Sequence, residues 1–143
     1  PKILVVPSSV TDDELRQIGE FRSKHRIPVV SWLRYDNRKN NVALLRSSQP
    51  LVGLPPQKRS EKDENYLYTL YKMNTINSTN SLFIMDARPL VNAVANRTTG
   101  GGYENQDFYK NCELVFLNIH NIHVMRESLR KIPRMQLTTI IVV

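Results

Sequence analysis

Residues 81–104 read SLFIMDARPLVNAVANRTTGGGYE, and this stretch decides the fold. Ser81–Asp86 is an apolar run with few polar interruptions, which predicts a buried central strand. Pro89–Asn96 predicts a short helix, with its proline in the first turn, where no backbone N–H is needed. The glycines Gly100–Gly102 follow. Strand, helix and loop in this order place the loop where α/β proteins bind ligands, beyond the carboxyl end of a strand.

The chain on both sides of this stretch alternates between strand and helix patterns. Two helices are expected to begin with a hydroxyl followed three residues later by an acid, at Thr11 and at Ser60, which is the spacing of a capping box. The first of them should reach about Ser23. Such an alternation, without internal repeats, predicts a layered α/β fold. The further elements expected are strands at Lys2–Pro7, Ile27–Leu33, Asn41–Arg46 and Cys112–Asn118, and a helix at Asn121–Lys131.

Composition limits the kinds of partner. The chain has 143 residues, of which 41% are apolar, enough for one globular domain with its own core. Twenty Lys and Arg against thirteen Asp and Glu give a net charge of +7, which favours an anionic partner such as an acidic membrane surface or a phosphorylated molecule. Aromatic residues are not interleaved with basic ones, so a nucleic-acid platform is not expected. The basic groups at 22–26 and 58–62 are interpreted as solvated loops or helix ends.

No catalytic nucleophile, metal or cofactor is expected within this chain. Cys112 is the single cysteine, and it begins an apolar strand without glycine. A phosphatase loop of the form Cys-x-x-x-x-x-Arg would need arginine where Asn118 stands, so Cys112 is interpreted as a packing residue. His120 and His123 have a spacing that could share a metal ion, but zinc sites need at least three protein ligands.

The glycine loop is the strongest candidate for binding an anion. Three successive glycines allow positive φ and a close approach of the backbone to a phosphate, and the amide of Asn96 could donate to it. Alternatively, Asn96 and Gly100–Gly102 form a polar helix end followed by a flexible turn. In the same way, Asn96 and Asn121 could both merely cap helices. Both interpretations remain open from the pattern alone.

Five stretches together resemble the myotubularin family, in its order and at its spacing. They cover nearly all of residues 1–131, and their sequence is most similar to the subgroup of the founding member. The stretches are 21–32 (FRSKHRIPVVSW), 48–53 (SQPLVG), 86–96 (DARPLVNAVAN), 100–104 (GGGYE) and 119–129 (IHNIHVMRESL).

This resemblance implies a partial cysteine-phosphatase fold, similar to protein tyrosine phosphatases, with a mixed sheet flanked by helices. It also implies removal of the 3-phosphate from phosphatidylinositol 3-phosphate and phosphatidylinositol 3,5-bisphosphate, without a cofactor, by a cytoplasmic protein that is peripheral on endosomal membranes. The residues that match the family's head-group contacts are Asn96, Asn121 and Ile122. A dimer partner from the same family is implied for the full-length protein.

The chain departs from the family pattern in three ways. The catalytic loop Cys-Ser-Asp-Gly-Trp-Asp-Arg does not occur in it, and Asn118 stands where the family usually has Asp. Residues 132–143 do not match the family's continuation, so the phosphatase-domain portion is expected to cover 1–131. A first residue of proline suggests a piece of a longer protein. We therefore expect a fragment of a phosphoinositide 3-phosphatase that is inactive alone, or alternatively a catalytically dead lipid-binding or regulatory module.

Overall fold

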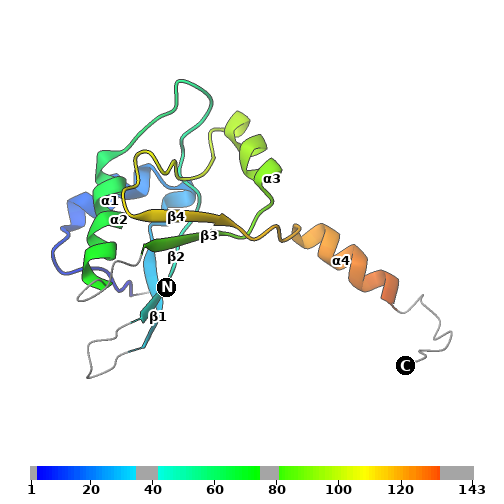
Figure 1. Cartoon of the computed structure of the whole chain (residues 1–143), viewed down its shortest axis with the longest axis horizontal. Helices are drawn as coiled ribbons and strands as arrows, with labels where there is room; N and C mark the ends of the chain where they lie inside the picture. The colour runs from blue at the N-terminus through cyan, green and yellow to red at the C-terminus, as the bar shows by residue number, and fades with distance from the viewer. Residues whose placement is uncertain (1–2, 35–41, 75–80, 133–143) are drawn as a thin grey trace.

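The structure is a computed structural model that describes residues 3–34, 42–74 and 81–132 (Figure 1). Helices and strands alternate through most of the chain, as the sequence pattern predicts. Two short 3-10 turns, Ser23–His25 and Asn96–Thr99, follow the first and third helices. The elements are α1 (Asp12–Glu20), β1 (Val29–Arg34), β2 (Val42–Arg46), α2 (Glu61–Asn74), β3 (Leu82–Asp86), α3 (Leu90–Ala95), β4 (Cys112–Phe116) and α4 (Ile122–Lys131).

The described strands form two small sheets rather than the single mixed sheet that we expected. Strands β1 and β2 pair antiparallel, with Val29 opposite Arg46 and Arg34 opposite Val42. Strands β3 and β4 pair parallel and in register, from Leu82 beside Cys112 to Asp86 beside Phe116. A parallel pair needs a long crossover, and here α3 and the glycine loop provide it. The fold is thus mixed α/β, with small sheets flanked by helices.

The strand predicted at Lys2–Pro7 is wrong for the residues that the structure describes there. Residues 3–7 have no strand assignment, and one backbone hydrogen bond, from Val30 N to Val5 O at 3.3 Å, joins them to β1. A single bond does not make a ladder, so β-branched composition alone was insufficient. The first helix also ends earlier than predicted, at Glu20, and Lys24 and His25 beyond it have positive φ of 55° and 54°.

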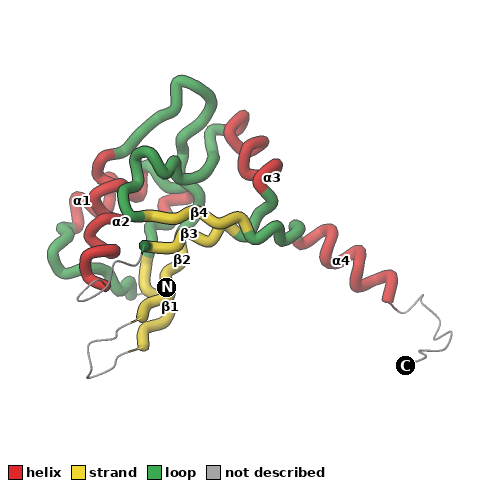
Figure 2. Tube along the Cα trace, viewed as in Figure 1, coloured by secondary structure: helices red, strands yellow, loops and turns green. Residues whose placement is uncertain are grey.

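Helix α2 is the centre of the core. On one side Tyr66 packs with Ile18 of α1 and with Ile27, and the Tyr66 hydroxyl donates to the carbonyl of Pro28 at 2.7 Å. On the other side Leu67 packs with Tyr109 and Cys112 beneath the parallel pair. Leu70 lies against both groups. Figure 2 shows long loops between the helices and strands, and the candidate site lies on these loops.

One face of the parallel pair is exposed among the described residues, so β3 is not the buried central strand that the sequence predicts. Phe83 is 54% exposed and Met85 is 65% exposed, whereas Ile84 faces the core. Helix α4 begins and ends close to where the sequence predicted, but it extends away from the body of the chain and buries no side chain (Figure 1). No helix within the described ranges is long and apolar enough to cross a membrane.

Candidate functional site

The three glycines form a closed, packed loop at the end of α3. Gly100 has φ 87°, and its N–H donates to the carbonyl of Arg97 at 3.0 Å, while Gly101 N donates to Asn96 O at 2.9 Å. The carbonyl of Gly101 in turn accepts from Gly53 N at 3.0 Å, which ties the loop to the segment 49–53. Gly101 and Gly102 are buried, so the loop is not the flexible turn of the alternative interpretation.

The glycines are required because the segment 49–53 lies directly against them. A Cβ atom at Gly101 would lie 2.6 Å from Nε2 of Gln49, and one at Gly102 would lie 2.2 Å from Cγ2 of Val52. Gly102 also has φ 152°, a conformation that L side chains rarely adopt. Close packing of the Gln49 and Val52 side chains against the loop backbone therefore explains Gly101 and Gly102 without any ligand.

Arg88 joins three parts of the site. Its Nε and Nη2 donate to the carboxylate of Asp86 at the end of β3, at 3.0 Å to Oδ1 and 2.6 Å to Oδ2. Nη2 also donates to the carbonyl of Gly102 at 2.8 Å, and Nη1 donates to Oε1 of Gln49. Because Asp86 neutralises it and the side chain is only 26% exposed, Arg88 holds the loops together rather than offering a free cation.

Asn96, the first of the predicted site residues, lies inside this network. It is the C-cap of α3, and the group that caps the helix is its backbone N–H, which donates to the carbonyls of Asn92 and Val94. The side-chain Nδ2 instead donates to Oε1 of Gln49 at 3.3 Å, and the side chain is half-buried. The cap interpretation therefore does not hold for the Asn96 side chain, which is fixed by a residue 47 positions earlier in the chain.

Asn121 and Ile122, the other predicted site residues, lie at the start of α4. Oδ1 of Asn121 accepts from His123 N at 3.0 Å and from Val124 N at 3.1 Å, which is a helix cap. Ile122 is 73% exposed. Among the described residues no hydrogen bond links these two positions to Asn96. What they share with Asn96 is position, since α3 and α4 follow the carboxyl ends of the paired strands β3 and β4.

His120 and His123 have no third metal ligand beside them among the described residues. Within the described part of the chain no three His, Cys, Asp or Glu side chains gather as ligands. His123 lies 3.3 Å from Arg126, between Nδ1 and Nη2, and this contact is compatible with an ordinary exposed helix surface.

Cys112 lies in the core on β4, with 7% of its surface exposed, in agreement with its interpretation as a packing residue. Burial raises the pKa of its thiol to about 11, and the nearby carboxylate of Glu104 adds to this effect. A phosphatase nucleophile needs the opposite, a pKa lowered toward neutrality and an accessible sulfur atom.

The sequence interpretation missed a buried ion network around Arg22. The sequence pattern predicts a solvated basic group at 22–26, but Arg22 is 1% exposed. Its Nη1 donates to Oε1 of Glu104 at 2.5 Å, and its other nitrogens bind Asp63, which also accepts from the Tyr109 hydroxyl at 2.7 Å.

This network shifts the pKa values of its members. Burial alone would lower the pKa of Arg22, but Glu104 and Asp63 raise it above its ordinary value. Burial and Asp63 likewise raise the pKa of Tyr109. No local signal marks this network, because its members are far apart in the sequence.

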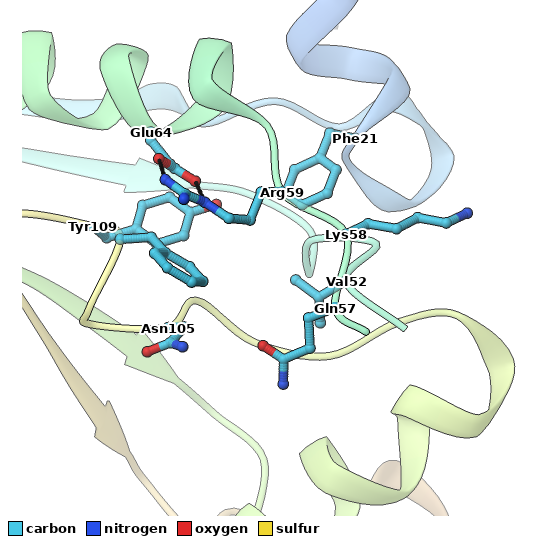
Figure 3. A pocket seen from close by; sticks show the side chains of 9 residues that line it. Phe21, Val52, Gln57, Lys58, Arg59, Glu64, Asn105 and Tyr109 are labelled. Carbon is cyan, nitrogen blue, oxygen red and sulfur yellow. Dashed lines mark hydrogen bonds and ion pairs between the residues drawn. The ribbon is translucent and has the colours of Figure 1, made fainter. Parts of the chain in front are cut away.

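A small hollow lies between Phe21, Val52 and Asn105 (Figure 3). Arg59 lies at its edge and binds Glu64 through two hydrogen bonds of 3.1 and 2.8 Å, while its guanidinium stacks 3.8 Å from the centre of the Phe108 ring. Figure 3 shows the side chain of Lys58 pointing away from the hollow. The hollow therefore lacks the converging donors that a phosphate site requires.

These features can be compared with known proteins. The family profile described as myotubularin-like phosphatase domain matches residues 1–139. The match thus runs past the boundary that we expected at residue 131. The chain belongs to this family.

Individual relatives agree with the family match. The chain is 55% identical over 132 residues to myotubularin of Xenopus laevis, which covers 92% of the chain and 21% of that protein. It is 51% identical over 140 residues to mouse phosphatidylinositol-3,5-bisphosphate 3-phosphatase MTMR2, which covers 98% of the chain and 21% of that protein. Rat myotubularin is 55% identical over 132 residues. The chain therefore spans about a fifth of the length of these relatives.

Proposed function

We propose that the protein containing this chain removes the 3-phosphate from phosphatidylinositol 3-phosphate and phosphatidylinositol 3,5-bisphosphate. The observation that carries the proposal is the 51% identity, over nearly the whole chain, to a mouse protein named for the second of these reactions. The matched region covers 98% of the chain, so it includes the glycine loop and both candidate helix ends. The proposed fold of the complete domain is that of a protein tyrosine phosphatase-like enzyme.

The contribution of this chain is part of the head-group site, with Asn96, Asn121 and Ile122 as the contacting residues. Two arguments support this role. Both helices that carry them follow the carboxyl ends of adjacent parallel strands, where α/β proteins bind ligands. In addition, the N-terminus of α4 has a positive dipole end that favours phosphate oxygens.

Chemistry on the phosphate requires a loop that this chain does not contain. Attack on phosphorus needs an activated thiolate, and the charge on the transferring group needs a clamping arginine. The cysteine that is present is buried and has a raised pKa. Residues 1–143 alone are therefore expected to be inactive, and the nucleophile belongs to the Cys-x-x-x-x-x-Arg loop of the complete protein.

The membrane is the second partner in this proposal. A net charge of +7 favours attachment to an acidic lipid surface, and the substrates are lipids of such surfaces. We place the protein in the cytoplasm, bound peripherally to endosomal membranes, where it pairs with a second member of the family.

The test is phosphate release from liposomes by the complete protein. Liposomes containing phosphatidylinositol 3-phosphate or phosphatidylinositol 3,5-bisphosphate should be dephosphorylated, whereas liposomes with phosphatidylinositol 4-phosphate should not. Residues 1–143, assayed beside a heat-treated sample, should release no phosphate. Binding of 3-phosphorylated liposomes without turnover would identify the complete protein as a dead regulatory module. Turnover of the 4-phosphate at an equal rate would contradict the proposed substrate class.

A further inference from the structure

The side chain of Gln49 links Arg88 to Asn96. Its oxygen Oε1 accepts two hydrogen bonds, one from Nη1 of Arg88 and one from Nδ2 of Asn96 at 3.3 Å. The three residues come from separate segments of the chain, since Arg88 and Asn96 lie 39 and 47 positions after Gln49. A single amide oxygen thus connects the end of β3 with the end of α3.

Arg88 determines which way both amides face. The nitrogen and oxygen of an amide are hard to tell apart by shape, so they are assigned from their partners. Arginine can only donate, so the Gln49 atom that meets Arg88 must be the oxygen. Since that atom is an acceptor, the Asn96 atom that meets it must be Nδ2. No described residue donates to Oδ1 of Asn96, so this oxygen and the second Nδ2 hydrogen remain for a ligand.

Arg88 is a firm anchor for this arrangement. The carboxylate of Asp86 binds it at two nitrogens, and the same carboxylate accepts from the backbone N–H of Arg88 at 2.9 Å. A third tie runs to the carbonyl of Gly102 at 2.8 Å. Gln49 also packs closely against Gly101, where a Cβ atom would lie 2.6 Å from Nε2 of Gln49. Neither side chain can turn without losing bonds.

We propose that Arg88 and Gln49 are positioning residues that fix the side-chain amide of Asn96 for the phosphoinositide head group. This inference rests on the proposed function, and it adds how the contact is oriented. The fixed amide presents one acceptor and one donor side by side. A ring hydroxyl can donate to the first and a neighbouring phosphate oxygen can accept from the second. Preorganisation of this kind lowers the entropy lost when the ligand binds.

A double-mutant cycle in the complete protein tests the inference. Gln49→Met keeps the length of the side chain and removes the shared acceptor, and Asn96→Ala removes the group that is positioned. We expect each single change to lower kcat/KM for phosphatidylinositol 3-phosphate, by about tenfold for Gln49→Met. When Asn96 is already alanine, adding Gln49→Met should lower kcat/KM further by less than about twofold, because the effect of Gln49 acts through Asn96.

Two further variants separate positioning from packing. Gln49→Glu retains an acceptor for both Arg88 and Asn96, so it should keep more of kcat/KM than Gln49→Met does. Gln17→Met makes the same change on the exposed surface of α1 and should match the unchanged protein. Melting temperatures of all variants are measured alongside. If the complete protein has no turnover, the same double-mutant cycle is measured through the dissociation constant for vesicles that contain phosphatidylinositol 3-phosphate.

The possible results are distinct. Full additivity of Gln49→Met and Asn96→Ala would overturn the positioning role, and so would an unchanged Gln49→Met beside a weakened Asn96→Ala. In both cases the proposed function would stand. If Asn96→Ala itself changes neither turnover nor vesicle binding, the assignment of Asn96 to the head-group site fails, and the positioning role fails with it.

Discussion

Arg22 and Asp63 meet in a two-point contact in the core, with Nε 2.8 Å from Oδ1 and Nη2 2.6 Å from Oδ2. Their side chains are 1% and 0% exposed, and they lie 41 positions apart in the chain. Glu104, the last residue of the glycine-loop segment, binds the same guanidinium. Two buried carboxylates therefore depend on a single cation.

Replacing Arg22 should destabilise the protein strongly. Arg22→Met leaves the carboxylates of Asp63 and Glu104 buried without their cation, which typically costs about 3–5 kcal/mol. We expect a fall of several degrees or more in the melting temperature of the complete protein. Arg16→Met is the matched control, because Arg16 pairs with Asp13 at an exposed site where such pairs contribute about 0–1 kcal/mol. Equal melting temperatures for the two variants would show that the buried contact contributes little.

The thiol of Cys112 should be unreactive in the folded protein. A rise of its pKa from 9.0 to about 11 lowers the thiolate fraction at pH 8 by about a hundredfold, and burial blocks access as well. Alkylation by iodoacetamide, followed by mass spectrometry of the peptide containing Cys112, should be slow at pH 8 and faster as the pH approaches 11. Labelling in urea provides the fully reactive reference. Native labelling at the rate seen in urea would contradict the burial of this side chain.

The glycine loop should tolerate alanine unequally. Gly102→Ala places a Cβ 2.2 Å from Val52 at a φ of 152°, and overpacking together with backbone strain should cost about 2–5 kcal/mol. Gly100→Ala meets no atom within 4 Å, so only the strain of its φ of 87° remains, about 1–2 kcal/mol. Thermal unfolding of both variants checks the order. A Gly100 variant that is the less stable of the two would be inconsistent with the packing described above.

Asn121 should contribute to stability through its cap, and a change that keeps the cap can reveal any further role. Asn121→Ala removes two bonds to backbone N–H groups and should cost about 1 kcal/mol of stability. Asn121→Asp keeps an oxygen acceptor at the cap but loses the amide donors. If Asn121 contacts the head group, the aspartate variant melts normally and still loses turnover. If the aspartate variant keeps full kcat/KM, Asn121 acts only as a helix cap and does not contact the head group.

Residues 1–143 in isolation should self-associate. Phe83 and Met85 leave one face of the parallel pair exposed, and α4 adds an apolar surface that no described residue covers. Parallel pairs are normally covered on both faces. Light scattering or size-exclusion chromatography should show large species, and Phe83→Lys should reduce them. A sharp monomer peak with a cooperative thermal transition would count against this expectation.

Local signals in the sequence predicted local structure well. The capping box at Thr11 is present with both reciprocal bonds, since Glu14 N donates to Thr11 Oγ1 and Thr11 N donates to Glu14 Oε2. The cap at Asn121 and the strand and helix that follow Ser81 are also found close to where they were predicted. In each case the residues that determine the element lie within a few positions of one another.

Tertiary relationships could not be predicted in the same way. Arg22 stands among basic neighbours, and nothing near it indicates that its partner is Asp63. The hydrogen bond from Asn96 to Gln49 spans 47 positions, and no local sequence pattern predicts it either. Whether a face of β3 is buried depends on which other elements pack against it, and the residues of the strand itself do not determine this. The head-group roles of Asn96, Asn121 and Ile122 stay predictions.

The contact between Arg22 and Glu104 sets an order of events during synthesis of the chain. The two residues are separated by 82 positions, so Glu104 emerges about 4–16 s after Arg22 at ordinary rates of translation. Until then the pair of Arg22 and Asp63 lacks its third partner, and we expect these charges to stay hydrated and this part of the core to stay open. We therefore expect a ribosome-bound chain that ends before Glu104 to remain sensitive to protease, and one that extends well beyond it to become resistant.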